Sequence, residues 1–344
     1  MDLVELVRHS TREVAVTARW VTVDPVGLAA FADTLLHDGS LVGGRTGGSS
    51  STSDDPWWVG DVQDAERRAA WVLTLATINF GSGWHDVLRK GPGRSGAITV
   101  AGAWRAGAES AGLLDPRNLS EVDTATMRSL FDQPDDGPGG TVTTLMEHFA
   151  AALREMGEVV CRRFHGRFLT LAATGEGSAV ALAETLATLP QFADRATHEG
   201  ADVFFYKRAQ LAAADVHRAF AGDTTTRDPV GVPAAESPGP LRDVGRLTAF
   251  ADNLVPHVLR IEGVLRYDPA LLARIDRGEL LEPGGTQEVE IRAAGVHAVE
   301  LLVADLRYRG ITINAADLDA VLWRRGGSPP FKAEPRHRCR TIYY

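Results

Sequence analysis

Hydrophobic side chains recur through much of this chain at intervals of three or four residues, which is the spacing of one face of an α-helix. The pattern is clearest in residues 64–80, 141–163 and 286–308. In the last of these segments the repeat falls on Val289, Ala293, Val296, Val299, Val303 and Leu306. Thr286 is positioned to cap this helix, and Glu288 places a negative charge near its positive end. We therefore predict a long helix in each of the three segments.

Strand-like patterns are short and few. Runs of β-prone residues occur at 97–104 (AITVAGAW) and at 201–206 (ADVFFY), and we expect a small strand in each. Helical periodicity dominates the rest of the chain. The sequence therefore predicts a mainly α fold with at most a few short β-strands.

Two segments interrupt the helical pattern. Residues 37–56 are rich in Gly and Ser, and they bury too little apolar surface to offset the entropy of ordering them. Residues 222–240 carry four prolines, which end helices. We predict a flexible loop in both. A chain of 344 residues with 44% apolar content can bury one large core or two fused lobes, so we expect residues 1–344 to form a single compact unit of two helical lobes.

The charge balance limits the class of partner. Acidic residues outnumber Lys and Arg by 45 to 36, which gives a formal net charge of −9. Binding to duplex nucleic acid needs clustered, uncompensated cations, so the sequence argues against that class. A small anionic ligand in a local basic pocket remains compatible with this composition.

Cysteine usage and hydropathy indicate the compartment. The chain has only 2 cysteines and contains neither C-x-x-C nor H-E-x-x-H, so neither a disulfide framework nor a zinc site is indicated. This usage fits a reducing cytoplasm. The N-terminal sequence MDLVELV lacks the cationic start and the continuous apolar run that a secretory signal has. The chain has no uninterrupted run of about 18 apolar residues, so we predict no membrane span.

Several acids lie near the C-terminal end, in residues 313–323 (INAADLDAVLW). Asn314 is a good N-cap, and Asp317 has a favourable charge at the third helical position. Asp319 shares a helix face with Trp323, so its carboxylate is either solvated at an edge or desolvated for chemistry. For an isolated acid on a helix, exposure is the commoner outcome.

A second arrangement lies in the segment FADN, just before a predicted helix. Phe250 and Asp252 are two residues apart there. An aromatic ring beside a carboxylate suits a guanine-like base, because the ring stacks and the carboxylate accepts hydrogen bonds from the N–H and amino groups. The alternative is that Asp252 or Asn253 only caps the next helix.

Cations and further acids occupy two other predicted helices. Lys207 and Arg208 follow an apolar run, and two adjacent cations can hold a phosphate. The alternative is an ordinary solvated pair at a helix start. Glu288, Glu290 and Arg292 are spaced to form an internal ion-pair network, which we interpret as structural.

Several of these blocks occur together and in a fixed order. They are INF (78–80), FYKRAQ (205–210), FAD (250–252) followed by LVPHVL, QEVEIR (287–292), the L-D-x-x-L-W run (318–323) and the closing H-R-x-R-x-I-Y-Y (337–344). With these motifs, which span about residues 64 to 344, the chain resembles the queuosine salvage protein family, the queuosine 5′-phosphate N-glycosylases. Independent motifs in one order are more specific than any single motif.

The resemblance implies a fold similar to helical DNA glycosylases and a hydrolase reaction without metal or other cofactor. The implied reaction breaks the N-glycosidic bond of queuosine 5′-monophosphate, a small-molecule nucleotide, and releases queuine for tRNA modification. By matching motif positions, Asp319 is the catalytic carboxylate and Asn314 lies in the pocket beside it. Phe250 and Asp252 recognise the deazaguanine base, and Lys207 binds the phosphate.

One segment departs from the family pattern. Better-known members follow Asn-Phe with an aromatic-rich run and have a His shortly before that helix. Here Asn79-Phe80 is followed by GSGWHDVLRK, and the upstream stretch PWWVGD has no His. A related deazapurine nucleotide is therefore an alternative substrate. Two other classes stay open, a nucleic-acid-binding module on the same scaffold and a noncatalytic binder of a modified base. The sequence predicts no oligomeric state.

Overall fold

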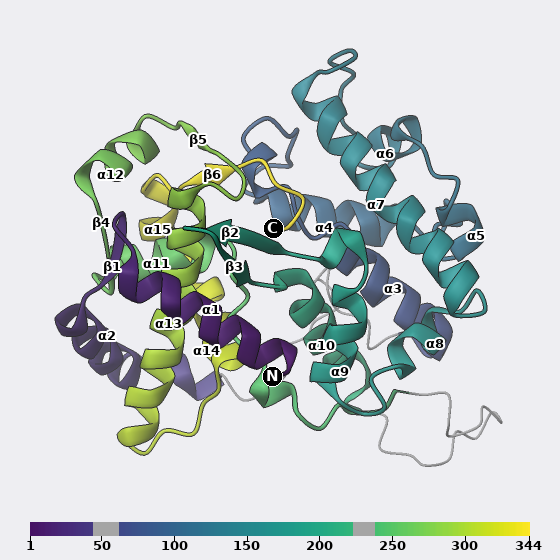
Figure 1. Cartoon of the computed structure of the whole chain (residues 1–344). Coiled ribbons are helices and arrows are strands. Elements are labelled where there is room, and N and C mark those ends of the chain that lie inside the picture. Colours follow the sequence, from purple (N-terminus) through teal and green to yellow (C-terminus); the bar gives the residue numbers. More distant parts are fainter. Residues whose placement is uncertain (44–61, 223–237) are drawn as a thin grey trace.

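Helices dominate the chain, as the periodicity predicts (Figure 1). The computed structural model describes residues 1–43, 62–222 and 238–344. The loops predicted at 37–56 and 222–240 fall largely in the two gaps. The prediction that they are flexible therefore concerns segments that lie largely outside the described residues. The mainly α fold class is confirmed.

The bounds of the elements, with η for 3-10 helices, are as follows. The first part of the chain forms α1 (Leu3–Thr17), β1 (Val21–Val23), α2 (Pro25–His37), η1 (Ser40–Gly43), α3 (Ala65–Thr77), η2 (Ser82–Trp84), α4 (Gly96–Gly107), α5 (Pro116–Leu119), α6 (Thr124–Leu130), α7 (Thr141–Arg163), α8 (Phe168–Ala173) and α9 (Ala179–Ala187). The second part forms η3 (Pro190–Phe192), β2 (Arg195–His198), β3 (Ala201–Phe204), α10 (Lys207–Phe220), η4 (Val244–Arg246), α11 (Leu254–Ile261), β4 (Leu265–Tyr267), α12 (Pro269–Asp276), β5 (Leu280–Leu281), α13 (Thr286–Tyr308), α14 (Ala315–Gly326), α15 (Pro329–Ala333) and β6 (Arg338–Cys339).

The three long helices predicted from periodicity are α3, α7 and α13, and α13 has the predicted bounds. One detail of α13 differs. Gly285 is the N-cap and offers no side-chain hydrogen bond, while Thr286 is the first helical residue. The cap predicted at Thr286 is therefore displaced by one position.

The strand predicted at residues 97–104 is wrong, because these residues lie within α4. Ser95 caps this helix, and its hydroxyl oxygen accepts a backbone N–H of the first turn at 3.2 Å. Val100 and Trp104 are buried one turn apart, and the Trp104 indole donates to the Thr74 hydroxyl at 3.2 Å. Packing of this apolar face against α3 outweighs the β propensity of the segment.

Strands form only small pairs among the described residues. β1 pairs antiparallel with β4, β2 pairs antiparallel with β3, and β5 pairs parallel with β6. The strand predicted at 201–206 is thus confirmed as β3. The β2–β3 pair directly precedes α10, and β6 belongs to the closing block.

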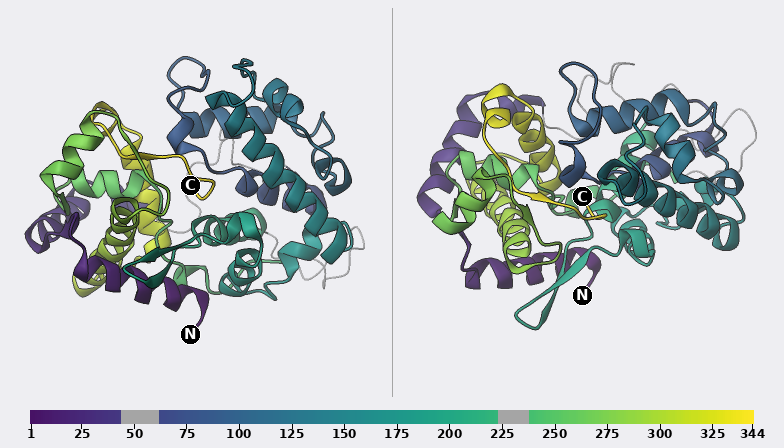
Figure 2. Two further views of the ribbon diagram at one scale, coloured as in Figure 1. Left: turned by 45° about the horizontal axis from the view of Figure 1, so that its top comes forward. Right: turned by 90° about the horizontal axis from the view of Figure 1, so that it is seen from above.

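Buried hydrophobic side chains form two cores. The larger core contains residues from α1, α3, α7 and α10, and the smaller contains residues from α2, α11, α12 and α14. Figure 2 shows the green and yellow helices of the C-terminal part on one side and the blue and teal helices of residues 62–222 on the other. Helix α13 contributes to both: Val289, Ala293 and Val296 to the larger, and Ile291, Ala294 and Ala298 to the smaller.

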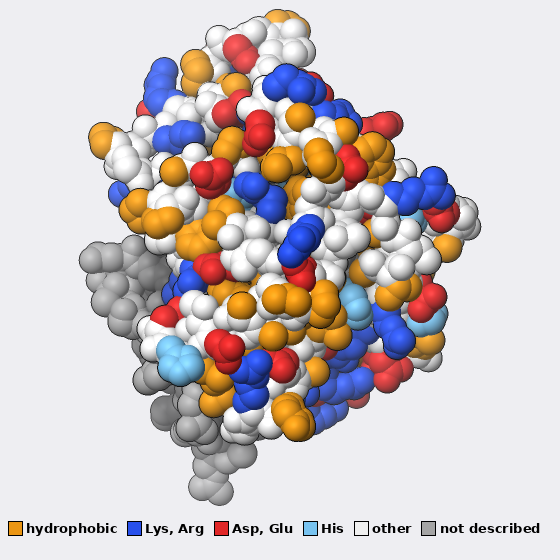
Figure 3. Space-filling view, turned by 90° about the vertical axis from the view of Figure 1, so that its left-hand side faces the viewer, with side chains coloured by type: hydrophobic (Ala, Val, Ile, Leu, Met, Phe, Trp, Pro, Cys, Tyr) orange, Lys and Arg blue, Asp and Glu red, His pale blue; other side chains and the backbone are white. Residues whose placement is uncertain are grey.

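The surface carries charges of both signs. On the face shown in Figure 3, Lys and Arg side chains alternate with Asp and Glu and with scattered hydrophobic groups. Within the described residues, no helix combines the length and hydrophobicity needed to cross a membrane.

Candidate active site

Asp319 lies inside the protein, in the first half of α14. Its side chain is 5% exposed, so the exposed position that is commoner for an isolated acid does not apply. The carboxylate oxygen Oδ1 accepts the backbone N–H of Phe250 at 2.8 Å. This hydrogen bond brings the L-D-x-x-L-W run and the FAD segment together.

The surroundings of Asp319 favour its neutral form. Its pKa is raised well above the ordinary value, first because burial removes the water that stabilises the charge, and second because the Asp252 carboxylate is near. The N–H of Phe250 and the ammonium of Lys207 act in the opposite direction. The structure therefore gathers Asp319, Asp252, Phe250 and Lys207 at one place.

Lys207 is the first residue of α10 and is 6% exposed. Its backbone N–H donates to Oδ2 of Asp194 at 3.2 Å. The residue before it, Tyr206, has a left-handed backbone with φ of 48°, which turns the chain sharply from β3 into the helix. Burial lowers the pKa of the Lys207 ammonium, while Asp252 and Asp319 favour the charged form.

Arg208 points away from this group and has a structural role. Its guanidinium donates to the carbonyl oxygens of Thr77 and Gln191. It also lies 4.9 Å from the centre of the Phe80 ring and 5.0 Å from that of Phe192. The two adjacent cations of FYKRAQ thus face different surroundings, and of the two it is Lys207 that lies near Asp252 and Asp319.

Asp252 and Asn314 both cap helices, as the simpler interpretation predicts. Oδ1 of Asp252 accepts the backbone N–H groups of Leu254 at 2.8 Å and Val255 at 3.1 Å. Oδ1 of Asn314 accepts the N–H of Asp317 at 2.9 Å, and its amide nitrogen donates to Oδ2 of Asp317 at 2.7 Å. Base binding by Phe250, Asp252 and Asn314 stays a prediction. A capping carboxylate still has a second oxygen to offer a ligand.

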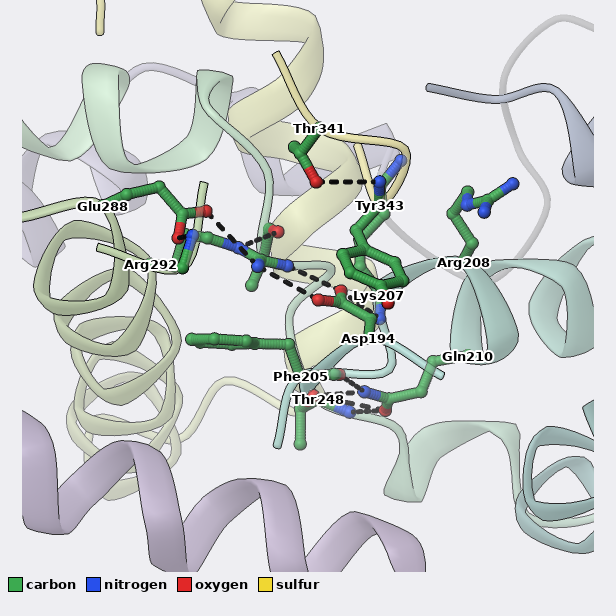
Figure 4. Close-up of polar contacts among 12 residues, drawn as sticks. Asp194, Phe205, Lys207, Arg208, Gln210, Thr248, Glu288, Arg292, Thr341 and Tyr343 are labelled. Carbon is green, nitrogen blue, oxygen red and sulfur yellow. Dashed lines mark hydrogen bonds and ion pairs between the residues drawn. The ribbon is translucent and has the colours of Figure 1, made fainter. Parts of the chain in front are cut away.

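Arg292 and Asp194 form a buried ion pair close to Lys207 (Figure 4). The Arg292 guanidinium forms two hydrogen bonds with the Asp194 carboxylate, at 3.0 and 2.6 Å, and an ion pair with Glu288 at 3.4 Å. Glu290 has other partners, namely the His198 ring at 3.3 Å and the backbone N–H groups of residues 19 and 20. The predicted ion-pair network therefore holds for Glu288 and Arg292 but excludes Glu290.

Asp194 was not predicted from the sequence. It lies between η3 and β2 and is 1% exposed, yet its partners are distant along the chain. Neither periodicity nor a short motif marks it. A buried Arg in QEVEIR is the only local sign that a carboxylate must lie opposite, because buried charges are paired.

The closing block of the chain reaches the altered segment that follows the INF motif. The main-chain oxygen of Tyr344 accepts the N–H groups of Gly81 at 3.0 Å and Ser82 at 3.4 Å. Trp84 of this segment is buried, and the Arg340 guanidinium lies 6.0 Å from the centre of its ring. The motifs that resemble one family in sequence are thus neighbours in space.

Known proteins of one family are similar to this chain. A sequence model described as queuosine salvage protein matches residues 60–344. A protein of Sphaerobacter thermophilus named queuosine 5′-phosphate N-glycosylase/hydrolase is 33% identical over 97% of this chain and 96% of its own. Proteins of the same name from Mus musculus and Bos taurus are each 28% identical, over 98% and 100% of both chains respectively.

Proposed function

This chain belongs to the queuosine salvage protein family, and on that premise we propose that it hydrolyses the N-glycosidic bond of queuosine 5′-monophosphate and releases queuine. Its similar relatives carry the name of that activity. The observation that supports the proposal best is the buried carboxylate of Asp319 beside Asp252 and Lys207. A buried acid among such groups is typical of a catalytic site.

Asp319 is the catalytic carboxylate in this proposal. Breaking an N-glycosidic bond builds positive charge on the ribose, and a fixed carboxylate near C1′ stabilises that charge or attacks the carbon directly. In a dry site this interaction is stronger than in water. The neutral form favoured without substrate gives up its proton, to the departing base or to solvent, as the ribose becomes positive.

Phe250 and Asp252 recognise the base. The ring of Phe250 stacks on the deazaguanine, and the free oxygen of Asp252 accepts from its N–H and amino groups. Asn314, at the start of α14, contacts the base as well, once its amide turns from Asp317. A 7-deazaguanine has no N7 to protonate, so hydrogen bonds at its other edges must stabilise the departing base.

Lys207 binds the 5′-phosphate. Its buried ammonium has a lowered pKa because of desolvation, and a phosphate dianion nearby would restore the charged form. The substrate is thus a small nucleotide, and duplex nucleic acid is disfavoured by the net charge of −9. We place the reaction in the cytoplasm because both cysteines, Cys161 and Cys339, are free thiols.

The test is incubation of the purified protein with queuosine 5′-monophosphate, queuosine and guanosine monophosphate, followed by detection of the free base. We expect release from the first, and a loss of roughly 10²- to 10³-fold in kcat for Asp319→Asn. Glu290→Gln is the matched control, since Glu290 is equally buried but lies away from these groups.

Two further results test the role of Lys207 and the identity of the substrate. Lys207→Ala should reduce turnover of the nucleotide more than that of the nucleoside, and equal losses would remove Lys207 from the phosphate site. Release of base from guanosine monophosphate alone would move the substrate to another nucleotide. No release from any of the three compounds would overturn the proposed hydrolysis.

A further inference from the structure

All three nitrogen atoms of the Arg292 guanidinium donate hydrogen bonds. Nε donates to the carbonyl oxygen of Ala251 at 3.0 Å. Nη1 and Nη2 donate to the two carboxylate oxygens of Asp194, at 3.0 and 2.6 Å. The side chain is 3% exposed, so these bonds form out of contact with bulk water. Figure 4 shows the guanidinium with its two acidic partners, Asp194 and Glu288.

Two aromatic rings and a second acid complete the enclosure of Arg292. The guanidinium carbon lies 3.9 Å from the centre of the Phe205 ring and 4.6 Å from that of Tyr344. Glu288, one turn earlier on α13, forms an ion pair at 3.4 Å. A planar cation that stacks on rings and bonds a carboxylate through two nitrogens is a role that Lys cannot fill.

Each of the two partners of Arg292 is joined to a residue of the proposed substrate site. Ala251 stands between Phe250 and Asp252, the proposed base-binding pair. Asp194 also accepts the backbone N–H of Lys207, the proposed phosphate-binding residue, at 3.2 Å. One buried ion therefore fixes the backbone at both ends of the site.

We propose that Arg292 is a positioning residue that sets the distance between the base-binding and phosphate-binding ends of the site. The inference rests on the proposed function, and it adds a role that the sequence interpretation left as structural. Arg292 touches no substrate. It acts through Ala251 on Phe250 and Asp252, and through Asp194 on Lys207. A nucleotide bound at both ends then presents its glycosidic bond to Asp319 in one orientation.

Glu290 separates this role from a general contribution to folding. It lies on the same helix, is 1% exposed and is part of a hydrogen-bonded buried network, as Arg292 is. Its partners are His198 and the backbone at residues 19 and 20, none of which borders the proposed site. Glu290→Gln therefore perturbs a buried network without touching either end of the substrate site.

The experiment compares Arg292→Lys with Glu290→Gln at a temperature below the unfolding transition of both. Hydrogen exchange of the Phe250 and Lys207 amides should speed up in Arg292→Lys and stay unchanged in Glu290→Gln. With queuosine 5′-monophosphate, kcat/KM should fall at least about 100-fold in Arg292→Lys, because small misplacements cost that much. Glu290→Gln should keep kcat within about 3-fold of the parent, as expected for a change remote from the site.

A double variant tests the path through Lys207. If Arg292 acts through that residue, Lys207→Ala should cost less in the Arg292→Lys background than in the parent protein. Fully additive losses, or unchanged exchange at both amides, overturn the inference. Where Arg292→Lys does not fold, Asp194→Asn takes its place with the same readouts. The exchange measurement needs no turnover, so it stands even where the parent protein releases no queuine.

Discussion

At the scale of single residues, the most important quantity is the free energy needed to keep the Asp319 carboxylate charged. Burial and the nearby Asp252 carboxylate raise the Asp319 pKa, so the folded protein binds this proton more tightly than the unfolded chain does. The contribution of Asp319 to stability is then fully present below the ordinary carboxyl pKa. It is lost as the pH rises through the raised, folded-state pKa.

Asp319→Asn should therefore stabilise the protein while it lowers kcat as proposed above. Asn is neutral at every pH and keeps an oxygen for the Phe250 N–H. At pH 8 we expect the free energy of unfolding to rise by at least about 1.4 kcal/mol, the equivalent of a one-unit pKa shift. Denaturant unfolding at pH 8 and pH 4 measures this, and the gain should shrink towards pH 4. A variant that is less stable than the parent at pH 8 would contradict the raised pKa.

Residues whose role is local were predictable, and those with distant partners were not. Asn314 bonds Asp317 within one helical turn, so the cap follows from the sequence. Burial of Asp319 depends on Phe250, which lies 69 positions away. The sequence alone favoured a solvated position for the Asp319 carboxylate over a desolvated one, and only the family resemblance singled it out as the catalytic carboxylate. Its burial came with the structure.

At the scale of elements, helix prediction succeeded where one face packs over several turns. The 23 residues of α7 and of α13 each give enough repeats to define a buried stripe. The prediction for the segment that forms α4 was wrong because Ala97–Trp104 combine Ile, Thr and Val with small residues, a composition that fits a strand as well as a helix. Contact with Thr74 of α3 decides between them, and that contact is invisible to a local pattern.

The close packing of η2 against β6 gives a prediction at this scale. A Cβ atom at Gly83 would lie 2.2 Å from the main-chain oxygen of Cys339, so Gly83→Ala must displace the closing block. We expect a loss of about 1–3 kcal/mol in the free energy of unfolding, typical of an overpacked site. Thermal unfolding measures it. Gly222→Ala is the control, because a Cβ there meets nothing within 4 Å, and an equal loss in both would argue against the contact.

At the scale of the whole molecule, two cores share one helix. Alternate faces of α13 bury side chains in the larger and the smaller core, so neither core can unfold without exposing part of this helix. Helix α1 adds a second link, since it packs on α13 and supplies Leu3 and Val4 to the larger core. The single unit of two lobes expected from the sequence remains a prediction.

Calorimetry tests that prediction. We expect one unfolding transition whose calorimetric and van't Hoff enthalpies agree, because the shared helix couples the two cores. Queuosine 5′-monophosphate added to Asp319→Asn should raise the transition temperature without splitting it, since a ligand that binds only the folded state stabilises the whole unit. Two resolved transitions would assign the cores to separate domains.

The hydrogen bond from the Phe250 amide to Asp319 also provides a spectroscopic reporter. An amide proton that bonds a charged oxygen resonates further downfield than one that bonds a neutral oxygen, because a charged acceptor makes the stronger bond. The Phe250 nitrogen lies 2.8 Å from Oδ1 of Asp319, so the chemical shift of the Phe250 amide proton follows the ionisation of Asp319. A titration of this one resonance would read the charge on the proposed catalytic group directly, in the resting protein.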